Sequence, residues 1–172
     1  MKQSRIIIGL GLAVALQLFV VLGMVGKAAL PMWIGEEIRV KTVPRDPRSM
    51  FRGNYARLNY EIGRLPKEML NTDRRLRRGE IVYVSLKKKG DGLYGIADAS
   101  LDKPDEGIFL RGRIVSKYAP YRVEYGIEAF FAPKKKALQL ERDLRNSGVA
   151  VLMVTDSGRV ALKDVVPEVA KK

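Results

Sequence analysis

The hydrophobic and polar positions divide the chain into two zones. Between Arg5 and Lys27 the run IIIGLGLAVALQLFVVLGMVG is apolar, with Gln17 as its only markedly polar side chain. As a helix rising 1.5 Å per residue it spans about 32 Å, which matches the hydrocarbon core of a bilayer. Trp33 follows at a depth suited to the membrane–water interface. We therefore predict a polar stub and a transmembrane anchor helix within residues 1–30.

A cleaved signal peptide is the alternative to an anchor. Its apolar core usually has about 7–15 residues, fewer than this run. The only small-x-small cleavage candidate, Gly26-Lys27-Ala28, contains a lysine, so we favour an uncleaved anchor. Basic residues flank the helix on both sides, and the positive-inside rule gives little guidance. Because a five-residue stub is a poor candidate for export, we expect a cytoplasmic amino terminus and an exported domain.

Beyond residue 35 the pattern changes to period two, as expected of strands with one buried face. The predicted strands are 36–43, 53–62, 80–88, 93–99, 108–116, 123–131, 149–155 and 159–165. A short helix is predicted after Pro66, and one soluble helix from Pro133 to Gly148, where apolar residues recur at helical spacing. We predict a mainly β (β-rich α+β) fold for residues 31–172, with antiparallel strands and one soluble helix.

Composition limits the chemistry available to this domain. The chain has no Cys and no His, which excludes disulfides, zinc sites built on these residues, and catalysis by a Cys thiolate or a His base. We expect no catalytic constellation, no metal site and no cofactor. After Pro31 there are 29 Lys and Arg against 19 Asp and Glu, a formal charge of +10. Such a surface attracts anionic lipid headgroups, acidic polymers or nucleic acid.

The first candidate site is the stretch Gly53-Asn54-Tyr55-Ala56-Arg57-Leu58-Asn59-Tyr60. Alternation assigns Leu58 and Tyr60 to the core face, and Gly53 with Asn54 suits a turn. The polar side chains Tyr55, Arg57 and Asn59 form either a ligand or partner surface, or a cross-strand polar ladder that fixes the register. We favour the ladder, because cross-strand pairs are the usual stabilising unit of sheets.

The second candidate site is Tyr125-Gly126-Ile127-Glu128. A glycine within a strand often marks a bulge or the close approach of another backbone. We expect Glu128 to form an internal ion pair with Arg57 or Arg113. A role as a glycosidase acid requires a second carboxylate at suitable separation, and nothing in the spacing selects Glu124 or Glu141.

These stretches resemble the GDYXXLXY family of bacterial membrane-anchored proteins. The resemblance covers most of Lys41–Leu162 in the ordered blocks KTVPRDPRSMFRGNYARLNYEI, VYVSLKK, FLRGRI and EYGIEAFF. Asn54 stands in place of the family's aspartate, which favours a turn-forming role over a catalytic or metal-binding one. The resemblance implies an amino-terminal anchor and a setting beside multi-pass membrane proteins. It implies no activity.

A serine–lysine hydrolase is a further alternative, since Ser49-Met50 precedes a strand that begins with glycine and a lysine run ends a later strand. Such a pair needs a desolvated lysine within hydrogen-bond reach of the serine. The run KKKGDG is typical of a solvated hairpin turn, so we do not assign this activity.

Three basic runs complete the candidates: Arg74, Arg75, Arg77 and Arg78; Lys87, Lys88 and Lys89; and Lys134, Lys135 and Lys136. Such runs are usually solvated faces, but the last opposes the macrodipole of its predicted helix, which favours a role. Each basic group near an anionic leaflet adds about 1 kcal/mol of attraction, so adhesion to lipid is plausible. Nucleic acid is not expected, because the runs lack interleaved aromatic residues.

We therefore expect a single-pass protein of the bacterial inner membrane with a periplasmic β-rich domain. Its expected function is that of a non-enzymatic binding or accessory protein, the partner of a multi-pass inner-membrane protein. Gly9, Gly11 and Gln17 are the small and polar positions that help helices associate. The alternative is a cell-envelope enzyme or sensor that binds an acidic polysaccharide or a lipid headgroup.

Overall fold

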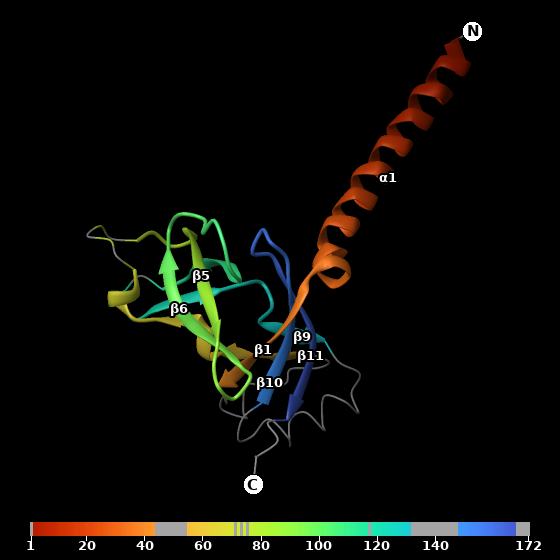
Figure 1. Ribbon diagram of the computed structural model, residues 1–172. Coiled ribbons are helices and arrows are strands. Elements are labelled where there is room, and N and C mark those ends of the chain that lie inside the picture. The colour runs from red at the N-terminus through yellow and green to blue at the C-terminus, as the bar shows by residue number, and fades with distance from the viewer. Residues whose placement is uncertain are drawn as a thin grey trace.

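The computed structural model describes residues 2–43, 55–70, 72, 74, 76–116, 118–131 and 148–167. A long amino-terminal helix projects from a domain built mainly of strands (Figure 1). This arrangement confirms the predicted β-rich fold with its amino-terminal helix. The soluble helix predicted to begin at Pro133 lies outside the described residues.

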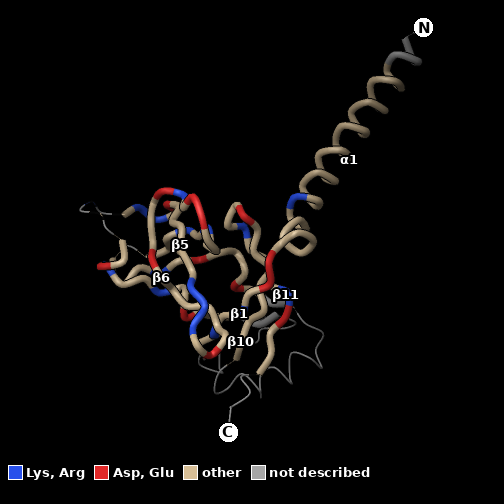
Figure 2. The backbone as a smooth tube through the Cα atoms, viewed as in Figure 1, with Lys and Arg blue, Asp and Glu red and all other residues tan. Residues whose placement is uncertain are grey.

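Helix α1 (Lys2–Ile34) is longer than the apolar run within it. Its segment Ile6–Ile34, 29 residues, is long and apolar enough to cross a membrane, and the window that meets this test is not buried by the rest of the chain. Trp33 has 76% of its surface exposed. Figure 2 shows that α1 is almost free of charge, whereas charged residues of both signs are spread over the domain.

α1 joins the sheet without a linker. The helix ends at Ile34, and strand β1 (Glu36–Val43) begins two residues later, as predicted. The N–H of Gly35 donates to the carbonyl of Pro31 at 3.0 Å. A Cβ on Gly35 would lie 2.9 Å from the backbone nitrogen of Val154 and 3.0 Å from the carbonyl carbon of Met153. Only glycine fits this joint without displacing backbone.

The remaining strands are β2 (Tyr55–Arg57), β3 (Asn59–Tyr60), β4 (Arg64–Leu65), β5 (Ile81–Lys88), β6 (Tyr94–Ser100), β7 (Phe109–Ile114), β8 (Tyr121–Glu124), β9 (Ala129–Phe131), β10 (Gly148–Val154) and β11 (Val160–Pro167). Nine strands form an open sheet in the order β11-β10-β1-β6-β5-β7-β8-β4, with β3 paired to β1, while β2 pairs with β9 alone. Among the described strand pairs only β1 with β6 is parallel, through the single pair Val40 and Tyr94. The sheet is therefore mixed but mostly antiparallel.

Alternation of side chains explains the central strands. In β5, Val82, Val84 and Leu86 are buried, while the residues between them are only half-buried. β10 is buried at six of its seven positions because it lies between β1 and β11. The turn Gly90–Gly92 joins β5 to β6, as predicted.

Two predicted strands are interrupted in the structure. The segment 53–62 contains β2, which pairs with β9, then β3, which pairs with β1, and then the 3-10 turn η2 (Glu61–Gly63). The segment 123–131 is split into β8 and β9. Both predictions of a continuous strand are wrong because each segment changes its pairing partner midway. The 3-10 turn η3 (Lys67–Met69) stands where a short helix was expected after Pro66.

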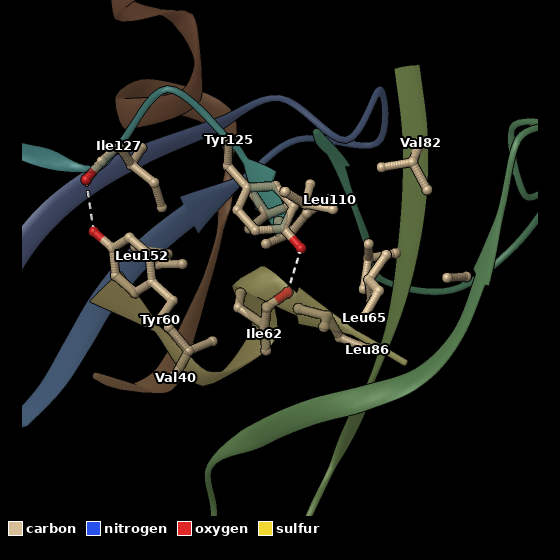
Figure 3. Packing of buried hydrophobic residues seen from close by; sticks show 14 of the residues in the cluster. Val40, Tyr60, Ile62, Leu65, Val82, Leu86, Leu110, Tyr125, Ile127 and Leu152 are labelled. Atoms are coloured by element: carbon tan, nitrogen blue, oxygen red, sulfur yellow. Dashed lines mark hydrogen bonds between the residues drawn. The ribbon is translucent and has the colours of Figure 1, made fainter. Parts of the chain in front are cut away.

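One hydrophobic core contains side chains from the central strands and from the two interrupted segments. Val40 of β1, Val82 of β5, Leu110 of β7 and Leu152 of β10 are completely buried. Figure 3 shows these side chains gathered with those of the interrupted segments. The core therefore holds both parts of the sheet together, although a single residue pair connects β1 to β6.

Candidate functional site

The first candidate site is only partly within the described residues. Gly53 and Asn54 lie outside them. The backbone of Tyr55 and Arg57 belongs to β2, whose partner is β9, while their side chains are not described. The proposed polar ladder of these side chains stays a prediction. Leu58 donates its N–H to the carbonyl of Glu128 at 2.7 Å, which joins the first candidate site to the second.

The core-facing residues of both sites meet through two buried tyrosines. The Tyr60 hydroxyl donates to the carbonyl of Ile127 at 2.6 Å, and the Tyr125 hydroxyl donates to the carbonyl of Ile62 at 2.6 Å (Figure 3). We call these four residues the tyrosine clasp. Burial, together with the negative charge of Glu128, raises the pKa of both phenols well above the usual value. The clasp ties residues 58–62 to residues 125–128, and it confirms Leu58 and Tyr60 as core residues.

Glu128 is held by a turn rather than by Arg113, and the side chain of Arg57, the other predicted partner, is not described. Its Oε1 accepts the N–H of Tyr125 at 2.6 Å, and its Oε2 accepts the N–H of Gly126 at 3.0 Å. Gly126 has φ +85°, a left-handed conformation that favours glycine. Arg113, one of the predicted partners, instead donates from Nη1 to the carbonyl of Gly79 at 3.1 Å. The expected ion pair with Arg113 is therefore replaced by bonds from Glu128 to backbone amides.

The described arginines of the first basic run differ in their contacts. Arg74 forms an ion pair with Glu80 Oε1, and Glu80 Oε2 accepts the N–H of Arg77 at 2.8 Å. These hydrogen bonds hold the pKa of Glu80 below its usual value. They also fix the turn that carries Arg78, whose side chain is exposed. Arg75 lies outside the described residues.

The lysine run lies at the end of the domain away from α1 (Figure 1). Lys87 and Lys88 end β5 and are exposed, while the ammonium of Lys89 lies 3.5 Å from Glu61 Oε1. The run Lys134, Lys135 and Lys136 lies outside the described residues. The described residues of the first two runs therefore lie at opposite ends of β5 and do not form one surface.

A cavity of about 520 Å³ lies between the last turns of α1 and the outer face of β7. We call it the junction pocket. Its wall includes Lys27 and Pro31 from the helix, and Tyr125, Gly126 and Glu128 from the second candidate site. The turn between β10 and β11 lies beside the same end of α1 (Figure 1). The pocket is thus built from segments far apart in the sequence.

Cationic side chains dominate the junction pocket. It is lined by five cations, Lys27, Arg78, Arg111, Arg113 and Arg159, and two carboxylates, Glu124 and Glu128. No ion pair joins any of these five cations to a carboxylate in the described part of the chain, although exposed ion pairs occur elsewhere in the domain. A binding site for an anion is the chemistry that this wall favours.

Local structure explains how β7 supplies two of these cations. In FLRGRI the buried positions include Leu110, Gly112 and Ile114, so Arg111 and Arg113 lie together on the opposite face. The N–H of Arg111 donates to the carbonyl of Gly158 at 2.8 Å, which brings the β10–β11 turn and its Arg159 against β7. The three arginines of β7 and of the β10–β11 turn come together because of this long-range contact.

Sequence reasoning missed the pocket, because it searched for consecutive basic residues. Among the described residues of the predicted basic runs, only Arg78 lines it. Lys27, Arg111 and Arg159 each stand singly between residues of other types. The one signal available was the alternation in FLRGRI, which places two arginines on one face of a strand.

A second, smaller cavity of about 190 Å³ touches the first candidate site. It is lined by Asn59 and Tyr60 together with Arg64, Arg122 and Glu124. Within the described residues, no group of three or more His, Cys, Asp or Glu side chains could hold a metal ion.

The family model described as GDYXXLXY protein matches residues 17–165 of the chain. No curated protein and no solved structure matches the chain.

Proposed function

Because the chain belongs to the GDYXXLXY family, we propose that it is a membrane-anchored binding protein, without catalysis of its own, that works beside a multi-pass protein of the bacterial inner membrane. The family resemblance supplies the setting, and the arrangement of α1 supplies the physical support. We further propose that the amino terminus is cytoplasmic and that the domain is periplasmic.

The observation that carries this proposal is the joint at Gly35. A freely tethered domain would need a linker of several flexible residues, whereas here one tightly packed glycine separates helix from strand. The domain is therefore held at one orientation relative to the helix axis. A fixed orientation favours recognition of a neighbour in the same membrane, because less rotational freedom is lost on binding.

The surface of α1 offers a place for such a neighbour. No atom of the described residues lies within 4 Å of a Cβ built at Gly9 or Gly11. Small residues allow two helices in a bilayer to approach closely, and polar residues such as Gln17 add hydrogen bonds between them. We propose that this part of α1 contributes to the contact.

The test is capture of the full-length chain from native membranes, with the captured proteins identified by mass spectrometry. The matched control replaces residues 6–25 with an unrelated transmembrane segment and keeps residues 26–35, so that the joint and the junction pocket are unchanged. We expect a multi-pass protein to be enriched at least tenfold with the natural helix over the control. Equal recovery by both chains would refute helix-mediated binding.

Topology has an independent test. An alkaline phosphatase fused after Lys172 folds to an active enzyme only outside the cytoplasm. We expect an active fusion, and an inactive one would place the domain in the cytoplasm.

The second candidate is an envelope sensor or enzyme that binds an acidic polysaccharide or a lipid headgroup. The cationic wall of the junction pocket favours ligand binding of this kind. The two functions separate through their variants: loss of partner with the exchanged helix supports the first, whereas loss of ligand with substituted pocket arginines supports the second.

A further inference from the structure

We propose that the junction pocket binds the phosphate of an anionic phospholipid headgroup from the leaflet that contains the carboxyl end of α1. This inference names the ligand class of the pocket. It does not depend on the multi-pass partner proposed above.

The first argument is depth. About 20 helical residues cross the hydrocarbon core, so a helix that enters it at Ile6 leaves it near Val25. Lys27, Ala28 and Pro31 follow within the next two turns, and all three line the junction pocket. The pocket wall formed by α1 therefore lies at the level where lipid phosphates are found.

The second argument is charge. The pocket brings Arg111 and Arg159 together with the other three cations against only two carboxylates. Both oxygens of Glu128 already accept backbone N–H groups, so its charge is directed toward the Tyr125–Gly126 turn. Gathering like charges destabilises a folded domain, and a bound dianionic or monoanionic group relieves that repulsion.

The third argument is the type of cation. Four of the five are arginines, and a guanidinium presents a planar fork of donors that matches phosphate oxygens. Arg113 already donates one bond to Gly79, which holds its guanidinium beside the turn that carries Arg78. The donors are thus partly positioned by the fold.

The fourth argument is the apolar part of the wall. Ala28 and Pro31 of α1, together with Val115 and Val160, also line the pocket. A lipid has both parts that this wall requires, because its phosphate is joined to a glycerol and to acyl chains. A soluble phosphate would leave the apolar side chains unused, and an acidic polysaccharide would have to enter at the membrane boundary.

The experiment uses the full-length chain in nanodiscs of equal phosphatidylcholine and phosphatidylglycerol, with retained lipid measured by native mass spectrometry after release. The test variant is Arg111→Gln with Arg159→Gln, whose side chains form no ion pair in the described part of the chain. The matched control is Lys87→Gln with Lys88→Gln, which removes the same charge from exposed positions away from α1. Circular dichroism establishes that both variants are folded.

We expect the unmodified chain to retain phosphatidylglycerol in preference to phosphatidylcholine. A contribution of about 1 kcal/mol per basic group corresponds to roughly fivefold per charge, so the pocket variant should lose the preference by about tenfold or more. The lysine control should stay within about twofold, because Lys87 and Lys88 lie at the other end of β5 from Ile81, which pairs with Arg113 of the pocket. At about 3.3 Å per strand residue this separation is roughly 20 Å, which exceeds the screening length of about 8–10 Å. An equal loss in both variants would overturn the site.

Two additions distinguish other sources of the anion. Glycerol phosphate in solution should not displace the retained lipid, and displacement at low concentration would replace the lipid with a soluble phosphate ligand. Dextran sulfate should bind both variants equally through the general positive charge. Binding of this polymer that is lost only with the arginine substitutions would overturn the lipid assignment in favour of an acidic polymer. Retention of the lipid preference by the exchanged-helix chain would separate this inference from the proposed partner.

Discussion

The tyrosine clasp and the junction pocket share Tyr125 but differ in whether their polar side chains have bonding partners. In the clasp both hydroxyls are buried and each bonds to a specific carbonyl. In the pocket, five cations converge without ion pairs in the described part of the chain. In the first candidate site Leu58 and Tyr60 thus maintain the fold, while the cations suited to a ligand come from other segments. A residue that stands out in the sequence need not be one that meets a ligand.

The largest expected effect is a loss of folding stability when a clasp hydroxyl is removed. Tyr60→Phe and Tyr125→Phe each leave a buried carbonyl without its donor, so each should lower the free energy of unfolding by about 1–3 kcal/mol. The measurement is chemical unfolding of the full chain in detergent. The matched control is Tyr83→Phe, because Tyr83 is half-buried and its hydroxyl makes no hydrogen bond in the described part of the chain. Equal effects at all three positions would contradict the clasp.

Alkaline pH should weaken the clasp next. The pKa of Tyr60 and Tyr125 is raised in the folded chain, whereas in the unfolded chain a tyrosine ionises near its usual pKa of about 10. The stability that the two phenols contribute is therefore fully present below pH about 10. Above that pH the free energy of unfolding falls by about 1.4 kcal/mol per pH unit for each phenol. Unfolding midpoints between pH 9 and 11 test this.

The double variant Tyr60→Phe with Tyr125→Phe sharpens the alkaline test. It should show a shallower loss of stability above pH about 10 than the unmodified chain, because neither clasp residue can then ionise. If the slope stays steep without the clasp hydroxyls, other groups control the alkaline transition.

A smaller effect is expected at the turn that the two regions share. Glu128→Gln replaces two carboxylate acceptors with a single amide oxygen, so one of the N–H groups of Tyr125 and Gly126 loses its partner. We expect a loss of about 1 kcal/mol, measured by unfolding. The same variant removes a negative charge from the junction pocket and should strengthen retention of phosphatidylglycerol. Weaker lipid retention would show that Glu128 helps to position the ligand.

The smallest effect on stability is expected in the pocket itself. Arg111→Gln with Arg159→Gln should change the free energy of unfolding by less than about 0.5 kcal/mol, as is usual for surface substitutions away from structural contacts. A large loss of stability would mean that these cations support the fold, and the contrast between clasp and pocket would fail.

Local pattern predicted the parts of the fold whose partners lie nearby in the chain. Alternation located the β5–β6 hairpin and its glycine turn, and an apolar run located α1. It failed at 53–62 and 123–131, because a change of pairing partner leaves the alternation of burial intact: Leu58 and Tyr60 are still buried. The pocket could not be predicted, since Lys27, Arg111 and Arg159 are brought together only by tertiary contacts.

The glycine joint also has a mechanical consequence. Because a single residue separates helix from strand, α1 and β1 move together as one rigid unit. β1 is in turn paired with β10 along seven positions. A tilt or axial rotation of α1 in the bilayer would therefore be transmitted as torque into the sheet instead of being absorbed by a hinge. Changes in bilayer thickness or in neighbouring helices would thereby become movements of the whole domain.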